Sequence, residues 1–266
     1  MAGRGQSADF VEALARGLDV IACFDATHRQ QSLSEIATAT GLARPTARRL
    51  LLTLEELGFV RSGKGGFTLT PRVLRLGSAY ASSLGLWEMA RPHLEDLVAR
   101  TGESSSMSQL DGSDIVYVAR AAVPKIIALR VEIGTLFPAT LTSQGKVLLA
   151  ALSAEERERV LALPTRSGLT QPEPDRDALE QELRDVRARG WALADEELAR
   201  GVRSVAVPVR DGEGAVRAAM NVTVHAAETS VETLTGSYLP MLIQAAGEIS
   251  ADWSLWLSRP MTEPHR

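Results

Sequence analysis

Hydrophobic residues recur at helical spacing in residues 41–58, the stretch whose pattern organises the first part of the chain. They fall on one face of a helix with 3.6 residues per turn, and Gly58 marks the end of the period. This apolar face consists of Ala47, Leu50, Leu51, Leu54 and Leu57. We therefore predict a helix that packs by its leucines and exposes Arg44, Thr46, Arg48, Arg49 and Thr53.

The segments on either side of this helix complete the pattern of a winged helix-turn-helix. Ser32 and Glu35 fit a capping box that opens a short helix. Two short strands, 59–61 and 67–70, are joined by the glycine-rich segment 62–66, which carries Lys64. In this motif the second helix enters the major groove and the hairpin lies along the phosphates. The predicted DNA contacts are Arg44, Thr46, Arg48, Arg49, Thr53, Ser62 and Lys64.

The alternative for residues 41–58 is a solvated helix whose arginines only keep it soluble, and the neighbouring motif argues against it. A first helix over residues 9–24 is expected to pack across the next two by a face of Phe10, Leu14, Leu18, Ile21 and Ala22. Residues 71–85 form a predicted linker helix with apolar residues on more than one side. The apolar excess on these two helices predicts a homodimer or tetramer.

After residue 86 the pattern alternates between helical and strand periods. A helix over 86–100 precedes predicted strands at 104–110, 114–121 and 126–133. Helices at 143–151, 153–163 and 176–189 come next, then strands at 191–195, 203–210 and 215–225 and a helix at 230–257. This order predicts an α + β domain with a mostly antiparallel sheet.

The strands 203–210 and 215–225 have two different faces. Val205, Val207 and Val209 share a face with Val216, Ala218, Met220, Val222 and Val224, as in an ordinary core. The other face carries small and polar residues, including Ser204, Asn221 and Thr223. If the turn pairs Arg210 with Ala215, Ser204 lies opposite Asn221. Such a face suits a ligand pocket, and the alternative is a face that a helix covers through small residues.

A helix predicted to begin near Ser143 offers free N–H groups around Ser143–Gly145, which suit a carboxylate. We therefore expect a small carboxylate effector. Arg203 is either its counter-ion or a partner of Asp195 or Glu197, and alternation favours the ion pair because it turns Arg203 away from Ser204.

Charge is distributed unevenly along the 266 residues, whose net charge is −4. Residues 1–84 carry 10 Lys/Arg against 7 Asp/Glu, whereas the remainder carries 19 against 26. Cations therefore concentrate where phosphate contact is predicted.

With 45% apolar and 23% charged residues, we expect a folded protein. We place it in the cytoplasm because no apolar run suits a membrane span or signal core. The single cysteine excludes an intrachain disulfide, and no cofactor or metal is expected.

The chain resembles the IclR (isocitrate lyase regulator) family of bacterial transcription factors over nearly its whole length. The resemblance rests on Ala15–Ile21, Leu33–Ala37, Thr46–Leu51, Leu57–Val60, Gly134–Ala139, Ser143–Leu149, Asp195–Glu197 and Gly201–Ala206. One departure is Ala43, which stands where relatives usually have a Ser or Thr cap for the recognition helix. Gly102–Ser106 and Asp114–Arg120 resemble the branch that senses protocatechuate, hydroxybenzoate and related acids of the β-ketoadipate pathway.

The resemblance implies three parts and a tail: a winged helix-turn-helix domain over 1–70, a linker helix over 71–85, a GAF-like α+β effector domain over 86–258 and a flexible tail over 259–266. It implies that the effector domain binds its ligand with Ser143, Gln144, Gly145, Asp195, Ser204, Asn221 and Thr223, and with Ile126 and Leu129 as apolar wall. The expected function is ligand-responsive regulation of aromatic acid catabolic genes through an operator in double-stranded DNA. The alternative within the family is a regulator of another pathway that senses a different small organic acid.

Two functions of other classes compete with this one. An enzyme is conceivable because Ser204, Asp195 and His225 are nominal members of a triad, but no histidine lies in a nucleophile elbow or a metal-ligand spacing. A sensor module without DNA binding is the other rival, and Arg48, Arg49 and Lys64 argue against it. We therefore predict that the protein is not an enzyme.

Overall fold

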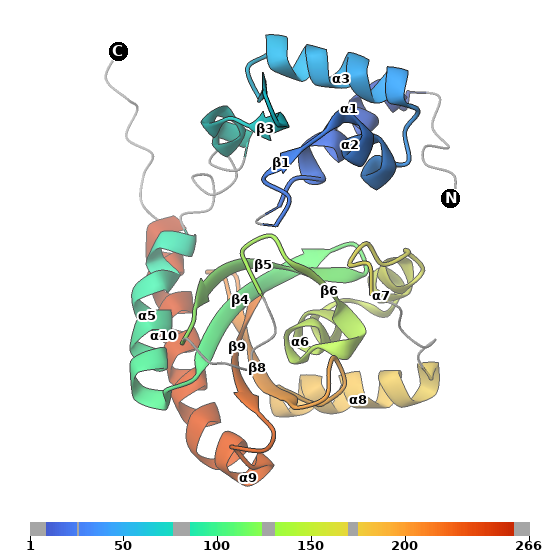
Figure 1. Cartoon of the computed structure of the whole chain (residues 1–266). Helices are drawn as coiled ribbons and strands as arrows, with labels where there is room; N and C mark the ends of the chain where they lie inside the picture. Colours follow the sequence, from blue (N-terminus) through green and yellow to red (C-terminus); the bar gives the residue numbers. More distant parts are fainter. Residues whose placement is uncertain (1–8, 26, 77–85, 124–130, 170–174, 258–266) are drawn as a thin grey trace. The chain divides into compact units, whose positions relative to one another are not determined.

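The computed structural model describes residues 9–25, 27–76, 86–123, 131–169 and 175–257 (Figure 1). The chain forms two compact units, Met1–Ser83 and Leu84–Arg266, which we call unit 1 and unit 2. None of the described helices combines the length and the apolar character that spanning a bilayer requires.

Unit 1 is a winged helix-turn-helix fold. Its elements are α1 (Glu12–Ala22), β1 (Gln30–Gln31), α2 (Leu33–Thr40), α3 (Arg44–Glu56), β2 (Val60–Gly63), β3 (Gly66–Leu69) and a 3-10 turn, η1 (Pro71–Val73). The capping box that begins α2 is confirmed, since the Ser32 hydroxyl accepts from the Glu35 N–H and the Glu35 carboxylate accepts from the Ser32 N–H. Ala43, as expected, caps α3 without a side-chain hydrogen bond. The wing is a three-stranded sheet of order β1-β3-β2, in which β1 was not predicted.

The predicted packing face of the first helix is confirmed at Ile21, which packs against the core of unit 1, but not at its other large residues. Phe10, Leu14 and Leu18 are 41, 63 and 53% exposed, whereas Val20 is buried with Ile36 in that core. Val20 lies about 200° around the helix from Leu18, so Leu18 points away from the core that Val20 enters. Leu57, also predicted to be packed, is 50% exposed because it lies beyond the end of α3. The predicted linker helix is described only as far as residue 76, and residues 77–85 lie outside the described part.

Unit 2 is an α+β domain built on one antiparallel sheet. Its strands are β4 (Ser104–Asp111), β5 (Asp114–Ala121), β6 (Leu136–Pro138), β7 (Ala192–Asp195), β8 (Val202–Arg210) and β9 (Val216–His225). They lie in the order β6-β5-β4-β9-β8-β7. Its helices are α5 (Leu86–Thr101), α6 (Ser143–Ala151), α7 (Ala154–Leu161), α8 (Arg176–Arg189), α9 (Val231–Thr233) and α10 (Leu239–Leu257), with a 3-10 turn η2 (Ala139–Leu141) and a π-helical turn η3 (Leu234–Tyr238).

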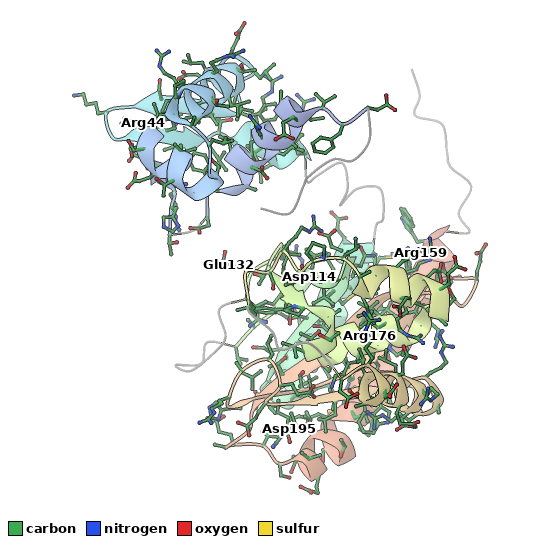
Figure 2. The ribbon with its side chains drawn as sticks, turned by 90° about the vertical axis from the view of Figure 1, so that its right-hand side faces the viewer. Arg44, Asp114, Glu132, Arg159, Arg176 and Asp195 are labelled. Atoms are coloured by element: carbon green, nitrogen blue, oxygen red, sulfur yellow. The ribbon has the colours of Figure 1, made fainter. Side chains whose placement is uncertain are left out.

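The two faces of this sheet are covered differently. α5 and α10 lie side by side over one face, and α6 and α8 lie over the other (Figure 1). The first face forms a core of large aliphatic side chains, among them Val207, Met220 and Leu242. On the second face, small residues such as Ala206 and Ala219 let α6 approach the sheet closely. Asp114 and Asp195 mark opposite ends of the unit (Figure 2).

Three predictions about the sheet need correction. Residues 131–133 are not a strand, since the third strand, β6, comes after Gly134; residues 126–130 lie outside the described part. Ser204 lies opposite Thr223 rather than Asn221, because Arg210 pairs with Val216 and an irregularity there adds one residue to the register. The same irregularity turns Val216 away from the valine face, and it packs in the cluster under α6.

Candidate functional site

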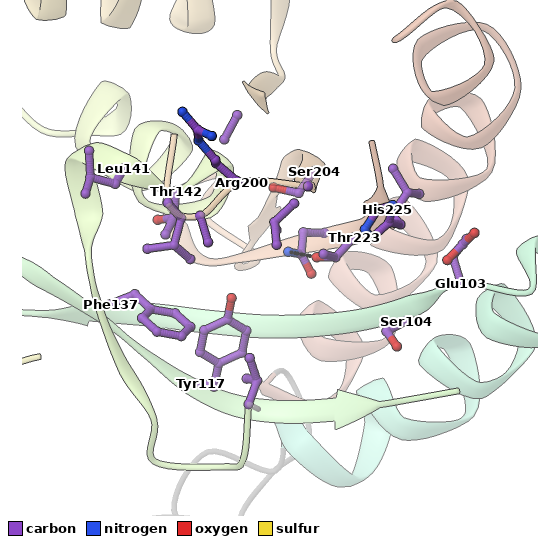
Figure 3. Close-up of a pocket in the computed structure, with 18 of the residues that line it drawn as sticks. Glu103, Ser104, Tyr117, Phe137, Leu141, Thr142, Arg200, Ser204, Thr223 and His225 are labelled. Atoms are coloured by element: carbon purple, nitrogen blue, oxygen red, sulfur yellow. Dashed lines mark hydrogen bonds between the residues drawn. The ribbon is translucent and has the colours of Figure 1, made fainter. Parts of the chain in front are cut away.

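A cavity of about 310 Å3 opens on the α6 side of the sheet in unit 2. Its walls come from strands β4, β5, β8 and β9, from the loop between β7 and β8, and from the start of α6 (Figure 3). Its lining combines apolar walls, polar tips and a few charged side chains. The lining residues include Glu103, Ser104, Tyr117, Arg120, Val131, Phe137, Thr142, Leu198, Ala199, Arg200, Gly201, Ser204, Asn221, Thr223 and His225.

The polar floor of the cavity follows from strand register. One row across the sheet joins Arg120, Ser106 and Asn221, and the next row joins Ser104, Thr223 and Ser204. Because directly opposed side chains on one face lie within contact distance, each row gathers polar groups from three strands. The predicted residues Ser204, Asn221 and Thr223 therefore meet on the floor of one cavity.

A β-bulge in β5 places two further side chains in this cavity. Met107 pairs with Ala119 and Ser108 pairs with Tyr117, so Val118 has no partner in β4. Ala119 packs toward α5, whereas Tyr117 packs on the α6 side. The extra residue lets Tyr117 and Arg120, three positions apart, line the same cavity, although strict alternation would separate them.

Arg120 provides a cation on the cavity floor. Its side chain is half-buried, and Nη1 donates a hydrogen bond of 3.1 Å to the Ser106 hydroxyl. Burial lowers the pKa of the Arg120 guanidinium below its ordinary value. An arginine nevertheless stays protonated at neutral pH, so it offers the remaining N–H groups of its planar fork to an anion.

Tyr117 provides a buried phenol beside this cation. Burial raises its pKa to about 12, and the nearby Arg120 charge opposes that shift. The hydroxyl is thus a neutral donor and acceptor at physiological pH. It points into the cavity, toward the side that carries Thr142 and Ser204 (Figure 3). The edge-to-face contact with Phe137, with centroids 5.8 Å apart, holds the ring in place.

Hydrogen bonds fix the predicted polar residues before any ligand binds. The Ser204 and Ser143 hydroxyls share a hydrogen bond of 2.7 Å. Asn221 Oδ1 accepts from the Ser106 N–H at 3.1 Å, and its Nδ2 donates to the Thr223 hydroxyl at 2.9 Å. A floor held in this way is preorganised, because its polar groups need no reorientation when a ligand arrives.

The other predicted effector residues lie behind the cavity or beside it. Ser143 and Gln144 are buried in α6, and the Gln144 amide donates to two strand carbonyls, those of Ser106 and Ala219. The Gly145 N–H donates to the Thr142 hydroxyl, which caps α6. Glycine is required there because a Cβ would collide with the Ala139 carbonyl.

Asp195 forms an ion pair with Arg203 in two bonds of 2.7 and 3.1 Å, which confirms the predicted pairing of Arg203. Ile126 and Leu129 lie outside the described residues. Sequence reasoning missed Tyr117, Phe137 and Arg120 as cavity residues. An arginine in an otherwise apolar strand was the available signal for Arg120.

The members of the nominal triad serve other contacts. The Ser204 hydroxyl is bonded to Ser143, and the Asp195 carboxylate is bonded to Arg203. His225 Nδ1 accepts from the Ala227 N–H at 3.2 Å. Among the described residues, no hydrogen bond joins Ser204, His225 and Asp195 into a relay.

The second candidate site is the outer face of α3 in unit 1. Arg44, Arg48 and Arg49 are exposed there, and Thr46 is half-buried. The Thr53 hydroxyl donates to the Arg49 carbonyl. These side chains project from a helix that the core of unit 1 holds through buried Ala47, Leu51 and Leu54. The arrangement matches a recognition helix whose cations are free to reach a phosphate or a base edge.

The wing is attached to this helix by one carboxylate. Glu55 of α3 accepts from both the N–H and the hydroxyl of Ser62 in β2, at 2.7 and 2.5 Å. These bonds lower the pKa of Glu55 below its ordinary value. Lys64 lies exposed at the tip of the hairpin. Ser62, predicted as a DNA contact, therefore also fixes the angle of the wing.

The chain matches two models of protein families. Residues 13–63 match the model described as the IclR helix-turn-helix domain, and residues 78–251 match the model described as the bacterial transcriptional regulator IclR C-terminal domain. Together the two matches cover most of the chain, with one domain for each unit.

Similar proteins extend the comparison. The chain is 37% identical over 245 residues to the Pca regulon regulatory protein of Pseudomonas putida, covering 91% of this chain and 84% of that protein. A transcriptional regulator from Rhodococcus sp. RHA1 has a structure with a TM-score of 0.78 at 46% identity, covering 93% of this chain and 100% of that one. An IclR homologue from Microbacterium hydrocarbonoxydans, solved with 4-hydroxybenzoate, has a TM-score of 0.78 at 25% identity, covering 92% and 100%.

Proposed function

The chain belongs to the IclR family of bacterial transcriptional regulators, and on that premise we propose that a hydroxylated aromatic acid bound in the cavity of unit 2 controls its activity on DNA. The observation that carries this proposal is that the bulge in β5 places both Arg120 and Tyr117 in the lining of one cavity. A guanidinium suits a carboxylate, and a neutral phenol suits a ring hydroxyl.

The shape and chemistry of the cavity support an aromatic ring between these two groups. Val131 and Phe137 provide an apolar wall, and Ser204 and Thr223 add polar tips. Largely apolar sites with a few convergent polar groups are typical of small-ligand binding. The Pca regulon relative and the homologue solved with 4-hydroxybenzoate support the same ligand class.

In this proposal the predicted effector residues take two roles. Ser204, Asn221 and Thr223 contact the ligand, and Ser143 acts through its bond to Ser204. Gln144 holds α6 against the sheet, Gly145 lets α6 approach Ala139 of η2, and Asp195 anchors the neighbouring loop through Arg203. The carboxylate position moves from the α6 N-terminus to Arg120, because the Gly145 N–H is already bonded to Thr142.

A second ligand class is favoured by a specific observation. Arg200 and His225 also line the cavity, with Glu103 as the acidic side chain among its charged lining residues. Two arginines in one cavity suit a dicarboxylate such as β-ketoadipate. The difference between the two classes is the number of carboxylates that the cavity accepts.

We further propose that α3 reads the operator through Arg44, Thr46, Arg48, Arg49 and Thr53, with Ser62 and Lys64 of the wing on the phosphates. Leu14 and Leu18 of α1 are exposed, as is Phe10 just before this helix, which supports at least a homodimer that places two winged helices on a roughly palindromic site. Sedimentation of a monomer at micromolar concentration, with and without DNA, would contradict the dimer.

The test of the effector is calorimetric titration of 4-hydroxybenzoate, protocatechuate and β-ketoadipate into the full chain. Gel shifts with the DNA upstream of its own gene, with and without each acid, then test the coupling. We expect a monocarboxylate with a ring hydroxyl to bind and to change operator affinity. Absence of binding by all three acids would contradict the proposed ligand class.

A further inference from the structure

One wall of the cavity is the loop of residues 196–201 between β7 and β8. Leu198, Ala199, Arg200 and Gly201 from this loop all line the cavity. Within the loop, the Gly201 N–H donates to the Glu196 carboxylate at 2.8 Å. The position of this segment therefore sets the width of the cavity on one side.

A buried lysine reaches this loop from α6. The side chain of Lys146 is 1% exposed, and its Nζ donates to both carboxylate oxygens of Glu197 at 2.7 Å. It also donates to Glu182 Oε1 of α8 at 2.6 Å. An ammonium group has three N–H donors, so these three acceptors use all of them.

The arrangement joins three parts of unit 2 at one atom. Lys146 lies in the first turn of α6, the helix whose cap Thr142 lines the cavity. Glu197 precedes Leu198, the first residue of the loop that lines the cavity, and Glu182 belongs to α8 on the outer side of α6. The same lysine thus holds the wall of the cavity and the helix behind it.

Stability alone accounts poorly for a charge in this position. Burying an ammonium costs desolvation free energy that the attraction of its partners often only offsets, and an apolar side chain of similar size can replace such a pair at little cost. Glu182 and Glu197 remain 35 and 37% exposed, so water would continue to hydrate them if the lysine were removed. What the contacts specify is where the loop lies.

We infer that Lys146 is a positioning residue of the effector cavity, which holds the loop 196–201 in its ligand-binding position through Glu197. This inference rests on the proposed function, because it assigns a role in effector binding to that cavity. The Glu182 contact fixes the lysine from the other side. Removing Glu197 detaches the loop from α6, whereas removing Glu182 leaves that attachment in place.

The matched variants Glu197→Ala and Glu182→Ala separate these contacts, since each removes one carboxylate from the same lysine. If the positioned loop falls to a tenth of the population, the effector affinity falls about tenfold. We expect that loss in Glu197→Ala and in Lys146→Met, and a change of less than about twofold in Glu182→Ala. The measurements are calorimetric titration of 4-hydroxybenzoate, thermal unfolding midpoints and amide hydrogen exchange at Gly201 and Val202.

Faster exchange of the loop amides in Glu197→Ala, with an unfolding midpoint like that of Glu182→Ala, would support positioning. Equal losses of affinity in the two alanine variants, or wild-type affinity and exchange in Glu197→Ala, would overturn it. If Lys146→Met does not fold, the comparison of Glu197→Ala with Glu182→Ala still tests whether Lys146 positions the loop. A wild-type protein that binds no acid would contradict the proposed function, while the exchange contrast would still test the attachment of the loop.

Discussion

The candidate functional groups lie on the surface of unit 1 but in the interior of unit 2. In unit 1 the candidate cations Arg44, Arg48 and Arg49 project into solvent from a helix whose other face is packed. In unit 2 the candidate groups lie inside, with Arg120 half-buried and Tyr117 buried at the floor of a cavity. This difference suits the two proposed ligands, because a duplex is bound from outside and a small acid is enclosed.

This contrast determines how sensitive each site is to local structure. An exposed arginine keeps its hydration and needs no partner, so its position follows from helix period alone. A buried polar group must be satisfied by neighbours, and a register shift of one residue moves it to the other face of the sheet. Substitutions inside unit 2 are therefore expected to have larger effects than substitutions on α3.

Ser204→Leu should produce the largest effect. The leucine fills cavity volume and leaves the Ser143 hydroxyl without its 2.7 Å partner, so we expect loss of the effector response and a free energy of unfolding lower by about 1–3 kcal/mol. DNA binding by the ligand-free protein should survive. Calorimetry and denaturant unfolding measure the two losses. Ser204→Ala, which removes the hydroxyl without adding volume, is the control, and effector affinity in Ser204→Leu equal to wild type would place the ligand elsewhere.

Arg120→Met should remove the partner of the carboxylate while keeping much of the side-chain volume. We expect effector affinity to fall about 100-fold, or about 3 kcal/mol, since a charge-assisted bond in a partly buried site is lost. The measurement is titration of 4-hydroxybenzoate into both proteins. Arg200→Met is the matched control and should have the smaller effect for a monocarboxylate. A larger effect at Arg200 would exchange the roles of the two arginines.

Arg48→Ala and Arg49→Ala should each weaken operator binding by about 1–3 kcal/mol if the side chain reads a base edge. Effector affinity should not change, because both residues lie in unit 1. Gel shifts with operator and unrelated DNA measure the loss and its specificity. Lys64→Ala is the contrasting variant, expected to weaken all sequences alike and to flatten the salt dependence. Unchanged operator affinity in the double arginine variant would exclude α3 as the recognition helix.

The smallest effect is expected at the attachment of the wing, where Ser62 lowers the pKa of Glu55. A carboxylate with a lower pKa in the folded state stabilises the fold above its ordinary pKa of about 4.3 and loses that contribution as the pH falls through the folded value. Ser62→Ala should therefore lower the thermal unfolding midpoint slightly at pH 7, and the difference from wild type should shrink on acidification. A difference that grew at low pH would contradict this linkage.

The sequence predicts the elements of unit 1 and the helices of unit 2 well, because local signals decide them. The capping box at Ser32 begins α2, and α8 ends at Gly190, which adopts the left-handed conformation expected at a helix end. The small-polar face of β8 and β9 was also predictable, and it holds both the packed α6 and the cavity. The predicted pocket and its alternative, a face that a helix covers through small residues, are therefore both present on the same strands.

What escaped prediction depends on pairing between distant segments. The partner of Ser204 was wrong because a register irregularity near Arg210 cannot be identified from alternation. Tyr117 and Arg120 were missed as cavity residues for the same reason, since alternation assigns them to opposite faces. The contacts of Lys146 join residues 36 and 51 positions apart, and no local pattern encodes them.

The bulge at Val118 has a consequence for how this strand can change during evolution. In β5, Val118 is the residue that has no partner in β4. Deletion of Val118 would therefore restore regular alternation and keep Tyr117 and Arg120 on the cavity face. Without the bulge, a chain that retains this residue would turn the guanidinium toward the aliphatic core beneath α5. We therefore expect homologues that lack this one residue to keep the arginine and the tyrosine on the same face of the sheet.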